Sequence, residues 1–413
     1  MKNELSRRAG LTYAGCMVLM ILCYGTVLML SIYVKGLCEA FHATTTQIQL
    51  LYTIKAAVSV AVSFAVAGFA NNLSSRKLLG IGVVSYSLFF FLISISNSLV
   101  FYYIGAVFFG IGVVLMGSAV IQPVVTRWHR NFLGLKIGLM TVAYSIFGAA
   151  FSVLFTKLQL SLGTQTTILI HGLVILIPGI FCILFLISDD PEKYGLSLEE
   201  VIPNEALQEK ETIAEPSNVS ARDYFRYPET WLLLVGLFLD SILYGGYLSN
   251  ASIVYSSLSF DTMQIASLIS VQTIFVSVWG FAFGFISDRI GACRSTVGVS
   301  AVVLFTMLFS LFNSLGDLSY ITTAIQAALV GSVCYQSMAG GLVFAELFGD
   351  KSVAMLMAVS MGFVYCGQMI GTPFATLLYE HTGGYAAFFR IMSLISALIM
   401  VMYILMVRIN KKR

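Results

Sequence analysis

The sequence has few charged side chains and no recognisable catalytic motif. Charged residues make up only 10% of the 413 residues, whereas soluble domains carry about 25%. The seven cysteines are scattered and odd in number, which excludes a disulfide framework. The four histidines are isolated, and the chain has no His-Glu-x-x-His run, phosphate loop or cysteine pair. We therefore expect no enzyme, no metal site and no cofactor.

The net charge of +3 is small and dispersed, so we expect no nucleic-acid partner. What the sequence has in abundance is apolar residues, at 58%. A helix that crosses the roughly 30 Å hydrocarbon layer needs about 20 of them in a row. Twelve stretches qualify: 11–34, 47–70, 78–95, 100–125, 134–157, 165–187, 231–255, 263–286, 295–312, 319–347, 353–378 and 385–408.

The first apolar stretch, 11–34, is too long for the core of a signal peptide and has no small-residue cleavage site, so we expect a retained span. Lysine and arginine predict the orientation of the chain. With a cytoplasmic N-terminus, 19 of the 23 basic residues fall on the cytoplasmic side. We therefore expect an integral, multi-pass, monomeric protein of the plasma (inner) membrane, surrounded by lipid, with both termini cytoplasmic.

One long connection divides the twelve spans into six and six. Residues 189–229 are polar and acidic, and 11 of the 20 acidic residues lie there. This composition is typical of a flexible, largely disordered tether. The sequence thus predicts an all-α membrane protein with an N-terminal six-helix bundle (1–188), a cytoplasmic linker (189–229) and a C-terminal six-helix bundle (230–413).

A short turn occurs once in each predicted half. "GFANNLSSRK" (68–77) joins the second and third spans, and "GFISDRIGACR" (284–294) joins the eighth and ninth, 216 residues later. An internal repeat in a membrane chain indicates two bundles related by symmetry. We expect Gly68 and Gly284 to allow close helix approach, and Asp288 to lie near the positive N-terminus of a neighbouring helix.

The second turn resembles the signature between spans 2 and 3 of the major facilitator superfamily, through Gly284, Asp288, Arg289 and Gly291. In the first turn Gly68, Arg76 and Lys77 match, while Asn72 stands where the family has aspartate. Such a resemblance implies the twelve-helix major facilitator fold, a transporter, and a latch that holds one orientation of the two halves. The candidate gating residues are Gly68, Arg76, Arg127, Gly284, Asp288 and Arg289.

Four further segments are similar to the oxalate/formate antiporter and monocarboxylate porter branch of this superfamily. They are "RWHRNFLGLKIG" (127–138), "DPEKYGLSLEE" (190–200), "AELFGDK" (345–351) and "GTPFATLLYEHTGGYAAF" (371–388). The same resemblance aligns Lys35 with a lysine near the outer end of the branch's first span. It implies a small-molecule carboxylate as the substrate.

Ionisable groups inside a bilayer are costly, so each of them is a functional candidate. Lys55 lies about 12 Å inside the second span, on a polar stripe with Tyr52, Ser59 and Ser63. This position is that of an anion-attracting group, although a lysine that extends to the outer surface explains it as well.

Asp240 is the acidic residue near the middle of a span, about 13 Å into the seventh, with Tyr244 and Tyr247 on the same helical face. We expect it to bind substrate or to carry a coupled proton; a static interhelical bond is the alternative. Gln122 and Gln336 complete the candidate substrate-binding set. Their amides either contact a polar solute or hold helices together.

These observations predict a secondary transporter of a small organic anion that works by alternating access, with proton symport or solute exchange. Two alternatives stay open. One is an exporter of apolar or drug-like compounds. The other, from a different class, is a transport-dead membrane sensor that signals through the cytoplasmic loop.

Overall fold

The computed structural model describes residues 2–27, 30–69, 74–96, 98–129, 132–188, 223–248, 251–256, 260, 262–315 and 319–411. Asn72, Leu73, residues 189–222 of the predicted linker and the side chain of Lys35 lie outside the described residues. The described residues form helices and no strands, and twelve of these helices are long and apolar enough to cross a membrane. The prediction of twelve spans is confirmed.

The chain forms two compact units. Unit 1 comprises Met1–Leu133, Ile146–Ser220 and Phe348–Val359, and unit 2 comprises Gly134–Ser145, Ala221–Leu347 and Ser360–Arg413. Most of each predicted half falls within one unit, while the first part of the fifth span and that of the eleventh are grouped with the other unit. The predicted domain boundaries stay a prediction.

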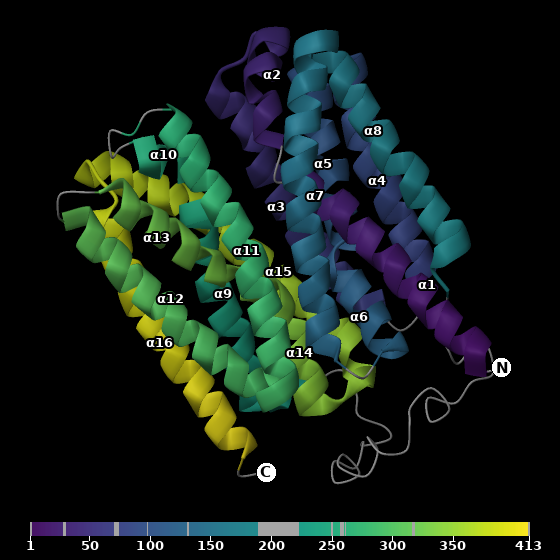
Figure 1. The fold of residues 1–413 in the computed structure, drawn as a ribbon, viewed down its shortest axis with the longest axis vertical. Helices are drawn as coiled ribbons and strands as arrows, with labels where there is room; N and C mark the ends of the chain where they lie inside the picture. The colour runs from purple at the N-terminus through teal and green to yellow at the C-terminus, as the bar shows by residue number, and fades with distance from the viewer. Residues whose placement is uncertain are drawn as a thin grey trace. The chain divides into compact units, whose positions relative to one another are not determined.

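Unit 1 holds most of the first six spans (Figure 1). Span 1 is built from α1, a π-helical turn η1, a 3₁₀ turn η2 and α2, and span 4 is broken into α5 and α6. Helix α4 packs on both α5 and α8, and α3 packs on α5. The bounds are α1 Lys2–Met20, η1 Ile21–Gly25, η2 Leu30–Tyr33, α2 Val34–Phe41, α3 Thr45–Phe69, α4 Ser75–Ile95, α5 Leu99–Leu115, α6 Ser118–Trp128, α7 Leu133–Leu162, α8 Thr164–Phe181 and the π-helical η3 Cys182–Leu186.

Unit 2 holds most of the last six spans, and span 10 is interrupted by a 3₁₀ turn, η8. Helix α16 lies against α12 and α9, and α11 lies against α13 and η8 (Figure 1). The bounds are η7 Asp223–Arg226, α9 Pro228–Leu248, α10 Ala251–Ser256, α11 Thr262–Ile290, α12 Ala292–Leu315, α13 Tyr320–Val330, η8 Gly331–Tyr335, α14 Gln336–Phe348, α15 Asp350–Thr382 and α16 Ala386–Asn410.

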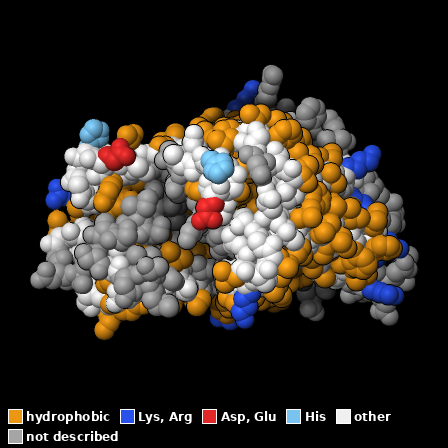
Figure 2. Space-filling model, turned by 90° about the horizontal axis from the view of Figure 1, so that it is seen from above, with side chains coloured by type: hydrophobic (Ala, Val, Ile, Leu, Met, Phe, Trp, Pro, Cys, Tyr) orange, Lys and Arg blue, Asp and Glu red, His pale blue; other side chains and the backbone are white. Residues whose placement is uncertain are grey.

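Large apolar side chains cover the outside of the helices. Phe185, Phe312 and Leu394 are each at least two thirds exposed. On the face drawn in Figure 2, hydrophobic side chains form broad areas and charged ones are few. In water such surfaces are unfavourable, so the exposed residues lie in lipid, as the composition predicts.

Glycines bring helices together inside unit 2. Gly367 and Gly371 of α15 form a Gly-x-x-x-Gly pair, and a Cβ atom at either position would meet the backbone of α9. Small residues four apart let two helix backbones approach closely, which is a common way to join helices in lipid.

Candidate functional site

The first span of unit 1 changes from an α-helix to a π-helical turn at η1, near the middle of the predicted span 11–34. A π-turn alters the local hydrogen-bond ladder, and side chains complete it. Thr26 donates from its hydroxyl to the carbonyl of Leu22 at 2.6 Å. The hydroxyl of Tyr86, from α4, donates to the carbonyl of Cys23 at 3.0 Å and lies 2.7 Å from the Thr26 hydroxyl. The irregular turn is therefore fixed in place by buried groups.

Span 4 is broken beside this turn. Gly117 is extended between α5 and α6, and a Cβ atom there would meet the Val113 carbonyl oxygen and the Tyr24 hydroxyl. The backbone N–H of Ser118, the first residue of α6, donates to the hydroxyl of Tyr24 at 3.1 Å. Irregular backbone at this depth is typical of substrate sites in secondary transporters, where half-helix N-termini point at anionic groups.

Lys55 lies close to the same junction. It is half-buried on α3, and its ammonium group interacts electrostatically with the thiol of Cys23 in the π-turn. Gln122 is buried on α6, one turn after the broken end, and its backbone carbonyl accepts a hydrogen bond from Thr126 at 2.9 Å. Two of the predicted substrate residues thus stand at the junction of spans 1, 2 and 4.

The predicted polar stripe of α3 divides into two parts. Tyr52 is 37% exposed, whereas Ser59 and Ser63 are fully buried. Ser59 donates to the carbonyl of Gly110 on α5 at 3.1 Å. The inner serines therefore serve the packing of α3 on α5, and only the outer part of the stripe, Tyr52 and Lys55, is accessible.

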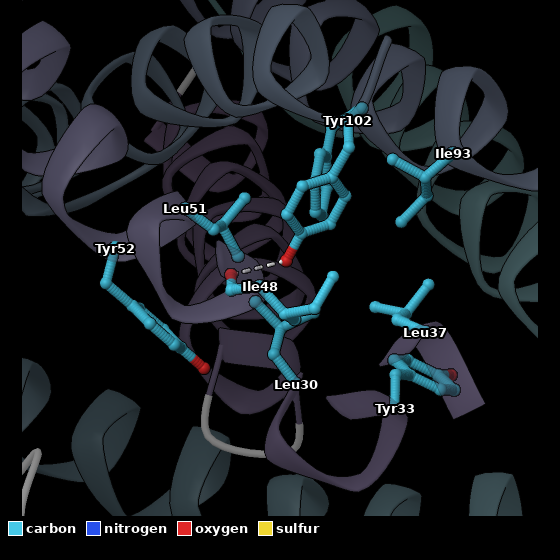
Figure 3. Close-up of a pocket in the computed structure, with 9 residues that line it drawn as sticks. Leu30, Tyr33, Leu37, Ile48, Leu51, Tyr52, Ile93 and Tyr102 are labelled. Atoms are coloured by element: carbon cyan, nitrogen blue, oxygen red, sulfur yellow. Dashed lines mark hydrogen bonds between the residues drawn. The ribbon is translucent and has the colours of Figure 1, made fainter. Parts of the chain in front are cut away.

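Tyr52 also borders a small, partly open apolar pocket at the end of unit 1 that holds α2. Figure 3 shows the hydroxyl of Tyr102 donating to the Ile48 carbonyl, at 2.9 Å, beside this pocket. Tyr33, another residue of the wall, is held by a 3.1 Å hydrogen bond between its hydroxyl and Nδ1 of His171. The pocket is lined by Leu30, Tyr33, Leu37, Ile48, Leu51, Tyr52, Phe89, Ile93 and Tyr102.

In unit 2, Asp240 of α9 is fully buried. Its carboxylate interacts electrostatically with Tyr335 of η8 and with Tyr403 of α16. Tyr335 is near enough to hydrogen-bond the carboxylate, although by distance and angle neither carboxylate oxygen has a partner among the described residues. The Tyr335 hydroxyl donates to that of Tyr403 at 3.3 Å. Gly236, one turn earlier, makes room for Tyr403. An acid surrounded in this way is expensive to keep ionised.

The other two substrate-binding candidates of unit 2 are Gln336 and Tyr244. The side-chain carbonyl of Gln336, the first residue after the 3₁₀ turn, accepts a hydrogen bond from the hydroxyl of Ser241. Tyr244 is half-buried on α9. The neighbours that the structure gives Asp240 all belong to unit 2.

A buried chain of hydrogen bonds, which the sequence analysis missed, lies at the outer end of unit 2. Gln326 donates to the hydroxyl of Tyr247 at 3.0 Å, and Tyr247 donates to Tyr255 at 3.3 Å. Asn313 donates to Gln326 at one end, and Gln272 accepts from Tyr255 at the other. Tyr247, predicted to share a face with Asp240, is therefore linked through this chain to spans 8, 9 and 10. A search of the sequence for polar residues that recur in spans 7 to 10 would have found this chain of hydrogen bonds.

Asp288 forms the contact that its sequence position predicts. Its two carboxylate oxygens accept hydrogen bonds from the backbone N–H groups of Gly134 and Leu135, at 2.8 and 2.7 Å. These are the second and third residues of α7, so Asp288 from α11 caps the N-terminus of α7, whose residues 134–145 are grouped with α11 in unit 2. The prediction that Asp288 lies near a helix N-terminus is confirmed.

Two facing Gly-x-x-x-Gly pairs support this cap. Gly134 and Gly138 of α7 lie against Gly280 and Gly284 of α11, and a Cβ atom on any of the four would meet the other helix. The expected close approach at Gly284 is confirmed. For Gly68, no described atom lies within 4 Å of where its Cβ would stand, and the expected close approach there stays a prediction.

The basic gating candidates make different contacts. Arg76 donates to the carbonyls of Ile183 and Leu184 at the end of span 6, at 2.6 and 2.7 Å, as expected for an arginine beside a helix C-terminus. The guanidinium of Arg289 lies 4.2 Å above the ring of Phe285. Arg127 stands half-buried in the last turn of α6.

The second copy of the repeat also contains a turn that glycine makes possible. Gly291 has a φ of 90°, a conformation that side chains disfavour. Directly after it, the backbone N–H of Cys293 donates at 3.0 Å to the carboxylate of Glu346, from α14. Two acids from the ends of spans 8 and 10 thus cap two helices. The capping role of Glu346 was not predicted, although the sequence shows this acid at the end of an apolar run.

Replacing Asp288 with alanine is expected to destabilise the α7–α11 contact. It removes two charge-assisted hydrogen bonds, and losing a helix cap costs about 0.5–2 kcal/mol. We expect a lower melting temperature in detergent and slower transport, with Asp288→Asn intermediate because an amide keeps one acceptor. Asp223→Ala is the control, since its ion pair with exposed Arg226, at 3.1 Å, contributes little. A melting temperature and transport rate equal to those of the wild type would contradict the assignment.

The model of one protein family matches residues 15–345, about four fifths of the chain, and its description is Major Facilitator Superfamily. The chain belongs to the Major Facilitator Superfamily. It is an integral membrane transporter and not an enzyme, and its surroundings are lipid. No curated protein matches the sequence.

Solved structures of this superfamily share the fold. A crystal structure of the fucose:proton symporter FucP in the outward conformation matches with a TM-score of 0.72 at 15% identity, over 97% of this chain and 99% of that one. A variant of FucP from E. coli gives 0.69 at 14%, over 95% and 98%. The human organic anion transporter MFSD10 (TETRAN) gives 0.68 at 14%, over 97% and 99%. The predicted fold class is confirmed.

Proposed function

We propose that this superfamily member is a secondary transporter of a small organic anion, such as a carboxylate, driven by proton symport or solute exchange. The observation that carries the proposal is Lys55, a cationic side chain deep in span 2, next to the π-turn of span 1 and the broken span 4. A cation at this depth costs free energy unless it serves a function, and an anionic solute would stabilise its charge.

The similarity of four segments to the oxalate/formate and monocarboxylate branch supports the same substrate class. Asp240 provides a group that can take up a coupled proton, because it is buried among tyrosines without a basic neighbour in the described part of unit 2. Alternating access then requires contacts that form in one state and break in the other. The Asp288 cap on α7 is the contact that we assign to this role. We expect the plasma membrane as the location, with cytoplasmic termini.

A counterflow experiment in proteoliposomes tests this function. The panel consists of mono- and dicarboxylates, amino acids, sugars and bile acids, each at two pH values. We expect accumulation of at least one carboxylate, and faster net uptake at the lower outside pH if a proton moves with it. Accumulation of sugars or amino acids alone would contradict the proposed substrate class, and liposomes without protein are the control.

The pocket beside Tyr52 favours a second candidate, the export of apolar or drug-like compounds. Its walls are apolar apart from three tyrosines, and apolar walls with a few polar groups suit apolar ligands. Export of a neutral dye from proteoliposomes, unaffected by Lys55→Gln, would support this candidate over the anion transporter.

A further inference from the structure

Tyr24 and Asp240 lie on the first span of each predicted half. Both residues contact the interrupted span of their own unit. Tyr24 accepts the N–H of Ser118 at the break of span 4, and Asp240 lies against Tyr335 in the 3₁₀ turn of span 10. The first and seventh spans begin 220 residues apart, at residues 11 and 231, so the two residues are comparable in their neighbours and do not share one repeat position.

The surroundings of the two residues differ in accessibility. Asp240 is fully buried, whereas Tyr24 is half-buried. The neighbours of Tyr24 in η1, namely Cys23 and Gly25, are buried. The π-turn thus presents one partly exposed side chain, and that side chain is a phenol.

The hydrogen bond to Ser118 makes this phenol a better donor. Its oxygen accepts from the N-terminus of an 11-residue helix, α6, where the helix dipole is positive. A hydroxyl that accepts one hydrogen bond donates a stronger one. The positive helix end and the polarised O–H therefore favour the same kind of ligand, an anion.

Two further observations point to an anion at this place. Lys55 lies near enough to interact electrostatically with Cys23, the residue before Tyr24. The hydroxyl of Ser118, which is 99% buried at the start of α6, has no hydrogen-bond partner among the described residues. A donor, a cation and an unpartnered hydroxyl gather around the broken end of span 4.

We propose that Tyr24 is a substrate-binding residue whose hydroxyl donates a hydrogen bond to the anionic oxygen of the solute, beside Lys55 and the N-terminus of α6. The inference rests on the proposed function for the identity of the solute. In this arrangement unit 1 supplies a neutral donor and unit 2 an acid, each beside the interrupted span of its own unit. Binding and proton uptake are thereby assigned to different units.

Cysteine labelling tests the proposal without a known substrate. Tyr24→Cys is made together with Cys38→Ser and Cys366→Ser, which removes the two described cysteines that are not buried. The purified protein in liposomes reacts with the anionic sulfonatoethyl or the cationic trimethylammonium-ethyl methanethiosulfonate. Each rate is divided by the rate of the same reagent on 2-mercaptoethanol. We expect reaction with both reagents and a several-fold preference for the anionic one.

Adding Lys55→Gln is expected to remove that preference, whereas Lys157→Gln, at an exposed position of α7, leaves it unchanged. If the thiol introduced by Tyr24→Cys is unreactive in a protein of normal melting behaviour, the proposal is overturned. A preference that survives Lys55→Gln would overturn it as well. Because no solute takes part, this outcome is separate from a failure of the counterflow panel.

Tyr24→Phe provides a second test that keeps the ring and so protects the fold. For a carboxylate that the wild type carries in counterflow, we expect the half-saturating concentration to rise about tenfold or more with little change in maximal rate. Tyr103→Phe, which removes a hydroxyl bonded to the Gln47 carbonyl at the outer end of unit 1, is the matched control. An unchanged half-saturating concentration in Tyr24→Phe would mean that the tyrosine only joins two helices.

Discussion

Lys55→Gln is expected to reduce counterflow of the transported carboxylate by about 100-fold or more, the largest loss that we predict for a single substitution. Removing one partner of a desolvated charge pair costs about 2–5 kcal/mol, and about 1.4 kcal/mol corresponds to a factor of ten. Glutamine has similar length and keeps two N–H donors, so the change tests the charge. The measurement is the initial rate of counterflow at equal amounts of reconstituted protein.

Two variants make this result specific. Lys55→Arg keeps the charge and is expected to retain part of the activity, while exposed Lys157→Gln keeps all of it. If the Lys55→Gln protein carries carboxylates as well as the wild type does, this lysine only reaches toward the membrane surface. Export of a neutral compound that persists in Lys55→Gln would favour the second candidate function.

The spans and the repeat were predictable from sequence because lipid imposes a simple rule. Each crossing needs a long apolar run, and the twelve runs match the twelve helices. The cap formed by Asp288 was predictable for a similar reason, since an acid at the end of an apolar run has few favourable partners other than a helix N-terminus.

The breaks in the helices were harder to predict. Span 4 reads as one apolar run through Met116 and Gly117, and hydropathy does not reveal that the backbone becomes extended there. The sequence signal was local. Gly117 is followed by Ser118, and the backbone N–H of Ser118, which the break leaves without a helical partner, donates to the hydroxyl of Tyr24. Tyr24 was overlooked for this reason.

Glycines were only partly informative. Gly284 and Gly68 occupy the same place in the two copies of the turn, yet only Gly284 faces another backbone among the described residues. The difference depends on the neighbouring helix, because α7 has Gly134 and Gly138 at the same spacing as Gly280 and Gly284 of α11. A Gly-x-x-x-Gly pair on both helices is the pattern that predicts contact.

Asp240→Asn is expected to weaken proton-driven accumulation strongly while solute exchange continues. Asparagine has the shape of the protonated acid but does not release a proton. A carrier whose coupling depends on Asp240 should therefore still exchange solute across the membrane, and its rate should lose its dependence on pH. We expect accumulation against a gradient to fall at least about tenfold, which corresponds to a loss of about 1.4 kcal/mol of coupling free energy.

The surroundings of Asp240 decide how this result is interpreted. The acid is fully buried beside Tyr335 and Tyr403, and none of the described residues offers it a hydrogen bond of normal geometry. A static structural bond would need such a partner, and its loss in Asp240→Asn would lower stability and exchange together. Asp240→Glu keeps a titratable group and is expected to restore part of the coupling. Accumulation and exchange that both persist in Asp240→Asn would remove the acid from the coupling mechanism, whereas loss of both in a protein of normal stability would place it in substrate binding.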